Sequence, residues 1–125
     1  MINGIGIDVV KIVRMERWRK QPGLLRRFFH EDEISAALEK GSGADMSLAA
    51  RFAAKEAFSK ALGTGFTGIA LKDIVVRNRE NGRPELHVYG TALTALNRSG
   101  SGNIHLSLSH ERDIAVAMVV LEGRQ

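Results

Sequence analysis

The chain has 125 residues, 44% hydrophobic and 26% charged, a balance that is typical of one globular domain and excludes a disordered chain. It contains no cysteine, which excludes a disulfide framework, a zinc–cysteine centre and a thiol nucleophile. No apolar run approaches the roughly 20 residues of a membrane-spanning helix, and no signal peptide is visible. We therefore expect a single domain over residues 1–125, located in the cytoplasm and without a membrane partner.

The net charge of +4 is unevenly distributed along the chain. Residues 11–27 carry seven basic side chains and one acidic one, Glu16, so this segment sums to +6 and the rest of the chain to −2. Such a patch is either a solvated helix face or the docking site of an anionic partner: a nucleic acid, an acidic membrane surface or an acidic protein. The basic residues are Lys11, Arg14, Arg17, Arg19, Lys20, Arg26 and Arg27.

The first half of the sequence predicts one strand followed by helices. Apolar alternation at residues 2–10 indicates the strand, and a basic amphipathic helix is expected at about 11–20. A short helix or turn follows at 24–29, and the acidic run 31–33 begins a further helix. The longest helix is predicted at 45–62, where small side chains form a stripe that allows close approach to a sheet. The stripe consists of Ala50, Ala53, Ala54, Ala57 and Ala61.

The second half is predicted to be mostly β-structure. Segments 73–79 and 85–89 flank an Asn-Gly pair, which is a strong hairpin signal. A short helix at 91–97 and a strand at 104–110 follow. Residues 114–121 are apolar at almost every position, which predicts a central strand covered on both faces. The segregated order favours an α+β fold with a mainly antiparallel sheet packed against a long central helix.

Three residues suggest a cation and phosphate site. Glu56 and Lys60 lie four residues apart on one helix face, and the alternative is a solvated ion pair that stabilises the helix by about 0.2–0.5 kcal/mol. Asp8 interrupts an apolar strand, and the alternative there is a helix N-cap. Asp8 and Glu56 together would supply two hard oxygen ligands, and Mg²⁺ takes one or two carboxylates.

His110 and Glu111 are further candidates at the end of a predicted strand. By alternation His110 shares the apolar face of Ile104, Leu106 and Leu108, so its alternative role is a hydrogen-bonded core histidine. Glu111 follows it into a loop and is either simply exposed or catalytic.

Taken together, these segments resemble the holo-acyl-carrier-protein synthases, the small bacterial group of 4′-phosphopantetheinyl transferases. The opening at 6–14 is similar to the family's G-I-D motif with its arginine. The run at 51–65, RFAAKEAFSKALGTG, is similar to the central signature, and shorter matches follow at 81–84 and 107–111. The resemblance covers nearly the whole chain. One departure is His30, where many relatives carry Thr or Ser at the helix cap.

The resemblance implies a 4′-phosphopantetheinyl transferase-like fold and a Mg²⁺-dependent reaction of fatty acid biosynthesis. The phosphopantetheine arm of coenzyme A would move to a serine of apo-acyl carrier protein, and adenosine 3′,5′-bisphosphate would be released. By matching positions, Asp8 and Glu56 are expected to bind Mg²⁺. Glu111, or a water molecule on the metal, is the candidate acceptor of the serine proton. The expected coenzyme A site includes Arg51, Lys60, Gly63 and His110.

The resemblance also implies partners. Acyl carrier proteins are acidic, and the residues expected to dock one are Arg14, Arg17, Arg26 and Arg27. Family members of this type are similar in forming homotrimers with the active site between subunits.

Two other classes compete with the transferase. A small nucleic-acid-binding protein would use the basic patch for phosphates, but it leaves Asp8 and the Glu56–Lys60 face unexplained. A catalytically silent interaction module would merely hold an acidic partner. We therefore expect coenzyme A and an acyl carrier protein as partners and no nucleic acid.

Overall fold

The structure of the protein is a computed structural model that describes residues 1–124. Its elements agree with the predicted order, with differences at their ends. The first helix begins later than predicted because β1 continues to Lys11 and pairs there with Ile114. The short helix begins earlier than predicted, at Pro22. The elements are β1 (Ile2–Lys11), α1 (Val13–Arg19), α2 (Pro22–Phe28), α3 (Glu31–Leu38), η1 (Gly41–Gly43), α4 (Ala44–Leu62), η2 (Leu71–Asp73), β2 (Ile74–Asn78), β3 (Pro84–Val88), α5 (Gly90–Arg98), β4 (Ser101–Glu111) and β5 (Ile114–Gly123).

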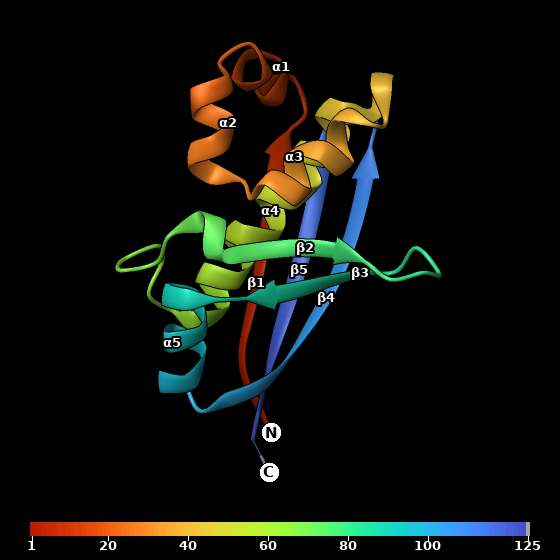
Figure 1. The fold of residues 1–125 in the computed structure, drawn as a ribbon. Coiled ribbons are helices and arrows are strands. Elements are labelled where there is room, and N and C mark those ends of the chain that lie inside the picture. Colours follow the sequence, from red (N-terminus) through yellow and green to blue (C-terminus); the bar gives the residue numbers. More distant parts are fainter. Residues whose placement is uncertain (125) are drawn as a thin grey trace.

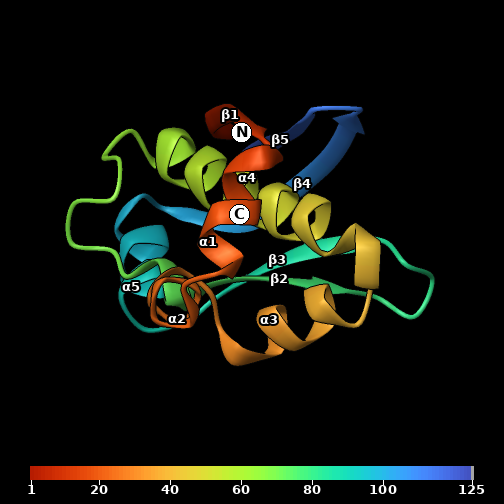
Figure 2. The ribbon, with the colours of Figure 1, turned by 90° about the horizontal axis from the view of Figure 1, so that it is seen from above.

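The strands form two antiparallel sheets (Figure 1). The larger has the order β1-β5-β4, so the predicted central position of β5 is confirmed. The smaller is the predicted hairpin of β2 and β3. In the view from above, α4 lies between the two sheets, while α2, α3 and α5 lie on the hairpin side (Figure 2). The long central helix therefore has one flank on β1 and β5 and another on the hairpin.

Two glycines of β1 allow α4 to approach the sheet closely. A Cβ atom on Gly6 would lie 1.9 Å from the carbonyl oxygen of Ala57, and one on Gly4 would lie 2.0 Å from that of Ala61. The predicted alanine stripe is buried at this contact, since Ala53, Ala57 and Ala61 are all inaccessible or nearly so. Small residues on both sides therefore fix the distance between the backbones of β1 and α4.

His30 does not weaken the start of α3, although it replaces the usual hydroxyl residue. Its ring Nδ1 accepts a hydrogen bond from the backbone N–H of Asp32 at 3.0 Å, and Glu33 accepts one from the backbone N–H of His30 at 3.1 Å. These two bonds form a complete capping box. The imidazole therefore caps the helix as a serine or threonine would.

The larger sheet is covered on one face only, which corrects the prediction that β5 would be covered on both. Alternate residues of β1 point away from α4, and Ile5, Ile7 and Val9 are more than half exposed. Their neighbour on β5 is Met118, which pairs with Ile7 and is 41% exposed. The apolar residues of β5 that point away from α4 therefore lie on a sheet face that no other part of residues 1–124 covers.

No helix among residues 1–124 is both long and apolar enough to cross a membrane.

Candidate active site

Asp8 lies in β1 opposite Ala117 of β5, on the face that packs against α4. Its carboxylate accepts a hydrogen bond from Lys60 Nζ at 2.9 Å, and its side chain is only 16% exposed. The position before α1 is occupied by Ile12, so Asp8 is not a helix cap. The structure therefore joins Asp8 to the helix face that the sequence singled out.

Lys60 forms its ion pair with Asp8. The alternative of a simple ion pair within the helix would require a pair with Glu56 instead. The Lys60 ammonium also donates to the carbonyl oxygen of Ile7 at 3.2 Å. The hydrogen bond that Lys60 donates to Asp8 and the negative charge of that carboxylate raise the pKa of Lys60. Lys60 therefore stays positively charged while half of its side chain faces solvent.

Glu56 lies one turn before Lys60 and is partly buried. Burial raises the pKa of Glu56, and the nearby Asp8 carboxylate raises it further, while Lys60 and Arg14 act in the opposite direction. Two carboxylates close enough to repel each other are a suitable pair for a hard divalent cation. The described residues contain no group of three or more His, Cys, Asp or Glu that would enclose a metal. The two carboxylates of Asp8 and Glu56 alone still fit Mg²⁺, because this ion completes its coordination shell with water and substrate oxygens.

Arg14 lies beside this carboxylate pair on an aromatic platform. Its guanidinium carbon is 5.2 Å from the ring centre of Trp18 and 5.3 Å from that of Phe52, within the range of a cation–π contact. Phe52 is buried in α4, one turn before Glu56. The platform therefore fixes an exposed positive charge next to the predicted metal site.

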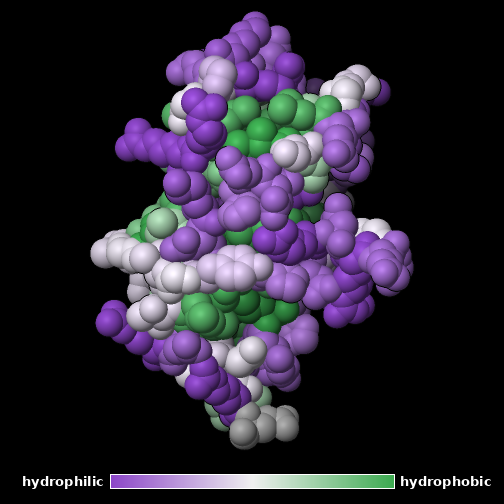
Figure 3. All heavy atoms as spheres, in the orientation of Figure 1, coloured by the Kyte–Doolittle hydropathy of each residue, from purple (hydrophilic) through white to green (hydrophobic). Residues whose placement is uncertain are grey.

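The other predicted docking residues surround α1 and α2. Arg17, Arg26 and Arg27 are exposed, and within residues 1–124 none of them forms an ion pair. Arg19 differs, because it pairs with Asp45 at 2.7 Å. Hydrophilic side chains gather over α1 and α2 in the space-filling view (Figure 3).

His110 lies in a pocket of about 280 Å³ on the hairpin side of α4. It is exposed, so the core-histidine alternative is wrong. Arg51 lines the same pocket, but it is almost fully buried and donates to the carbonyl oxygen of Val76. Asn78, Gly82 and Pro84 of the hairpin complete this wall, together with residues of β4.

The helix α4 separates the two groups of residues. Arg51 and Lys60 are nine positions apart, about two and a half turns, so they project from opposite sides of the helix. Asp8 and His110 lie on strands at opposite edges of the sheet, about 10 Å apart between backbones. One chain therefore brings together Asp8, Glu56 and Lys60, but not these three with His110.

Two further predicted residues stand apart. Gly63 ends α4 with a positive φ of 81°, and no atom lies within 4 Å of where its Cβ would be. Glu111 is exposed at the end of β4, and alternation places it on the opposite face from His110. The structure does not bring Glu111 next to Asp8 within one chain.

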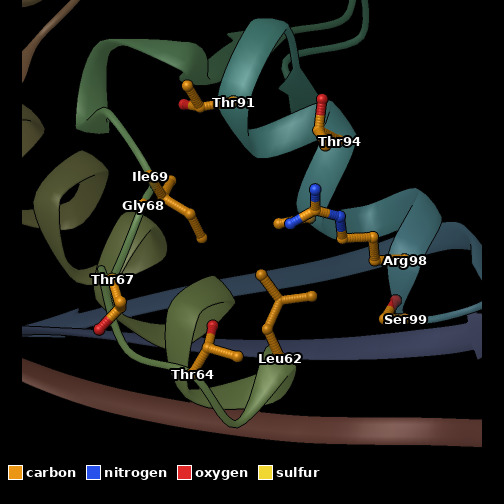
Figure 4. A pocket seen from close by; sticks show the side chains of 10 residues that line it. Leu62, Thr64, Thr67, Gly68, Ile69, Thr91, Thr94, Arg98 and Ser99 are labelled. Atoms are coloured by element: carbon orange, nitrogen blue, oxygen red, sulfur yellow. The ribbon is translucent and has the colours of Figure 1, made fainter.

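A second pocket of about 450 Å³ lies between the loop after α4 and the helix α5 (Figure 4). Thr64, Thr67 and Thr94 lie around it, with Leu62 facing Arg98. None of the predicted catalytic residues lines this pocket.

Comparisons with known proteins identify the family of this chain. Residues 4–119 match the family model described as the 4′-phosphopantetheinyl transferase superfamily. The chain is 55% identical over 123 residues to holo-[acyl-carrier-protein] synthase of Treponema denticola, covering 98% of this chain and 100% of that protein. It is 46% identical to the Syntrophus aciditrophicus protein of the same name, covering 98% of each.

Solved structures of that enzyme have the same fold. The Neisseria meningitidis synthase superposes with a TM-score of 0.88 at 35% identity, covering 98% of this chain and 99% of that one. The Bacillus anthracis synthase, solved in complex with CoA (3′,5′-ADP), gives 0.81 at 40% identity and covers 99% of both chains. By these matches, the chain belongs to the 4′-phosphopantetheinyl transferase superfamily, as an enzyme of the holo-[acyl-carrier-protein] synthase type.

Proposed function

We propose that this enzyme transfers the 4′-phosphopantetheine group of coenzyme A to a serine of an apo-acyl carrier protein and releases adenosine 3′,5′-bisphosphate. The observation that carries the proposal is the approach of Asp8, Glu56 and Lys60 at the contact between β1 and α4. The Bacillus anthracis relative was solved with CoA (3′,5′-ADP), which supports the choice of substrate. The proposal places the reaction in the cytoplasm, within fatty acid biosynthesis.

The reaction requires positive charge around the pyrophosphate. The serine oxygen forms a bond to the phosphorus of the pantetheine phosphate, and the bond from that phosphorus to the bridging oxygen breaks. The bridging oxygen leaves as part of adenosine 3′,5′-bisphosphate, and the serine proton passes to water. Asp8 and Glu56 would hold Mg²⁺, which when bound supplies charge to the phosphate oxygens. Lys60 donates a hydrogen bond to the pyrophosphate, and its raised pKa keeps it an ammonium ion. Catalysis then rests on positioning and electrostatics.

The pocket with His110 is proposed to hold the nucleotide end of coenzyme A. His110 is exposed there and able to contact a phosphate, while Gly82 and Pro84 shape the wall. Arg51, buried in the pocket wall, would contribute positive charge, although its Nε and one terminal nitrogen already donate to Ser47 and Val76.

The arginines of α1 and α2 are proposed to dock the acidic carrier protein. Arg14 is the best-supported docking residue, because its guanidinium lies on the rings of Trp18 and Phe52 beside Glu56. A carrier bound there would present its serine to the carboxylate pair, and the exposed arginines would steer its approach.

The open face of the larger sheet supports a homotrimer. Ile5, Ile7, Val9 and Met118 make an apolar surface continuous across β1 and β5, and monomers rarely leave such surfaces exposed. Assembly of three copies through this face would bring the β1 edge of one subunit toward the β4 edge of the next. A complete site would then combine Asp8, Glu56 and Lys60 with His110 of the adjacent subunit.

Intact-protein mass spectrometry tests the proposed reaction. An apo-acyl carrier protein is incubated with the enzyme, coenzyme A and Mg²⁺, with EDTA as control. The proposal requires a mass gain of one phosphopantetheine group that EDTA abolishes. No gain with several carriers and a folded enzyme would contradict it, and steeply salt-sensitive binding to random DNA would then favour the nucleic-acid alternative.

A further inference from the structure

The outer edge of β2 is covered by charged side chains and not by another strand. Among the described residues β2 pairs only with β3, so the backbone groups on its other edge have no partner strand. Glu33 Oε2 accepts a hydrogen bond from the N–H of Val76 at 3.1 Å, and Arg51 donates to the carbonyl oxygen of the same residue. Lys55 donates to the carbonyl oxygen of Ile74. Three charged side chains therefore take the place of a neighbouring strand.

Glu33 is the centre of this arrangement. Its carboxylate is fully buried, and Lys55 Nζ lies 2.7 Å from Oε1. The guanidinium of Arg51 lies 3.8 Å from Oε2. Burial lowers the pKa of both Lys55 and Arg51, and the charge of Glu33 opposes that shift. Glu33 is thus the counter-ion of both cations as well as a direct partner of β2.

The clamped strand leads into the wall of the pocket that contains His110. Asn78 ends β2 and lines this pocket, as do Gly82 and Pro84 on the other side of the hairpin turn. Arg51 and Val76 line the pocket too, and both contact the Glu33 carboxylate. The position of this wall depends on where Glu33 and Arg51 hold Val76.

We propose that Glu33 is a positioning residue for the nucleotide pocket: by clamping β2 through Val76 and Arg51, it sets the affinity for coenzyme A without touching the substrate. The inference rests on the proposed function of the pocket. Coenzyme A binding and the chemical step can be separated here, because Asp8, Glu56 and Lys60 lie on the opposite flank of α4 from Glu33. A change at Glu33 should weaken coenzyme A binding and leave the chemical step nearly intact.

Glu33→Gln tests the proposal, with Glu31→Gln as the matched control on the exposed side of the same helix. In Glu33→Gln we expect the KM for coenzyme A to rise about tenfold, with kcat and the KM for the carrier protein within about twofold of wild type. The Kd of adenosine 3′,5′-bisphosphate, measured by calorimetry, should rise in parallel. The control should match wild type in every constant.

An unchanged KM and Kd in a folded but less stable variant would show a structural role only and overturn the proposal. So would a fall in kcat with an unchanged KM. Should Glu33→Gln not fold, the double variant Glu33→Met with Lys55→Met replaces the ion pair by apolar groups. The N–H of Val76 then loses its acceptor, while Arg51 still donates to the carbonyl oxygen. The same rise in Kd is expected, and a wild-type Kd would overturn the proposal. If wild type binds the bisphosphate but transfers nothing, the proposed function fails, while the affinity comparison still decides the role of Glu33.

Discussion

Lys60 and Asp8 are 52 residues apart in the sequence, yet their charged groups lie 2.9 Å apart across the contact between α4 and β1. This distance depends on backbone contacts nearby, since Gly4 and Gly6 allow the helix to lie directly on the strand. The packing of small residues and the chemistry of the site are thus parts of one arrangement.

Removal of either charge from this pair should reduce catalysis far more than stability. We expect Asp8→Asn and Lys60→Met each to lower kcat about 10²- to 10³-fold, because each removes electrostatic stabilisation at the reacting phosphate. Steady-state transfer assays at saturating coenzyme A measure the effect, and thermal unfolding serves as control. A kcat within about threefold of wild type in a folded variant would be incompatible with the proposed roles.

Addition of one methyl group to β1 should disturb both fold and site. In Gly6→Ala the new Cβ would meet the carbonyl oxygen of Ala57 at 1.9 Å, so strand and helix must separate. We expect a loss of about 1–3 kcal/mol in the free energy of unfolding and a marked loss of activity. Gly23→Ala is the matched control, since nothing lies within 4 Å of that position. Equal unfolding midpoints for both variants would refute the close-contact explanation.

The raised pKa of Glu56 should be visible in the pH dependence of stability without metal. Because burial and Asp8 raise its folded pKa above the ordinary value of 4.5, the folded state binds this proton more tightly than the unfolded state. The resulting stabilisation is fully present below the unfolded pKa and is lost as the pH rises through the folded one. The stability of wild type minus that of Glu56→Gln should therefore fall as the pH rises above about 4.5. Denaturant unfolding in EDTA measures this difference, and a difference that increases with pH would have the wrong sign.

A charge on the open sheet face should prevent assembly. Met118 is 41% exposed on this face, and Met118→Glu is expected to give a monomer with little transferase activity. Leu38→Glu is the matched control because Leu38 is 49% exposed on α3, away from the sheet. Sedimentation velocity distinguishes the species. A wild type that is itself a clean monomer at micromolar concentration, or a fully active monomeric Met118→Glu, would argue against the trimer.

Local patterns were sufficient to predict the order of the elements and to single out Asp8, Glu56 and Lys60, which the fold brings together. Alternation predicted β1 and β5, and the alanine stripe predicted the contact of α4 with a sheet. The partner of Lys60 was not predictable, because helix spacing favours Glu56 while tertiary contact brings Asp8 closer. Glu33 was also missed: it follows two exposed acids in the first turn of α3, and nothing local distinguishes the buried one. His110 is exposed because it lies on the edge strand β4 and lines an open pocket beside α4, which periodicity does not reveal.

Mixing two inactive variants tests whether each active site combines Asp8, Glu56 and Lys60 of one subunit with the His110 pocket of the adjacent subunit. Lys60→Met impairs the flank on β1, and His110→Ala impairs the pocket on the hairpin side. When the two variants are refolded together in equal amounts, random assembly should restore about a quarter of wild-type activity, since one site in four combines two intact halves. Activity in the mixture no greater than the mean of the separate variants would mean that each subunit completes its own site, contrary to the arrangement proposed here.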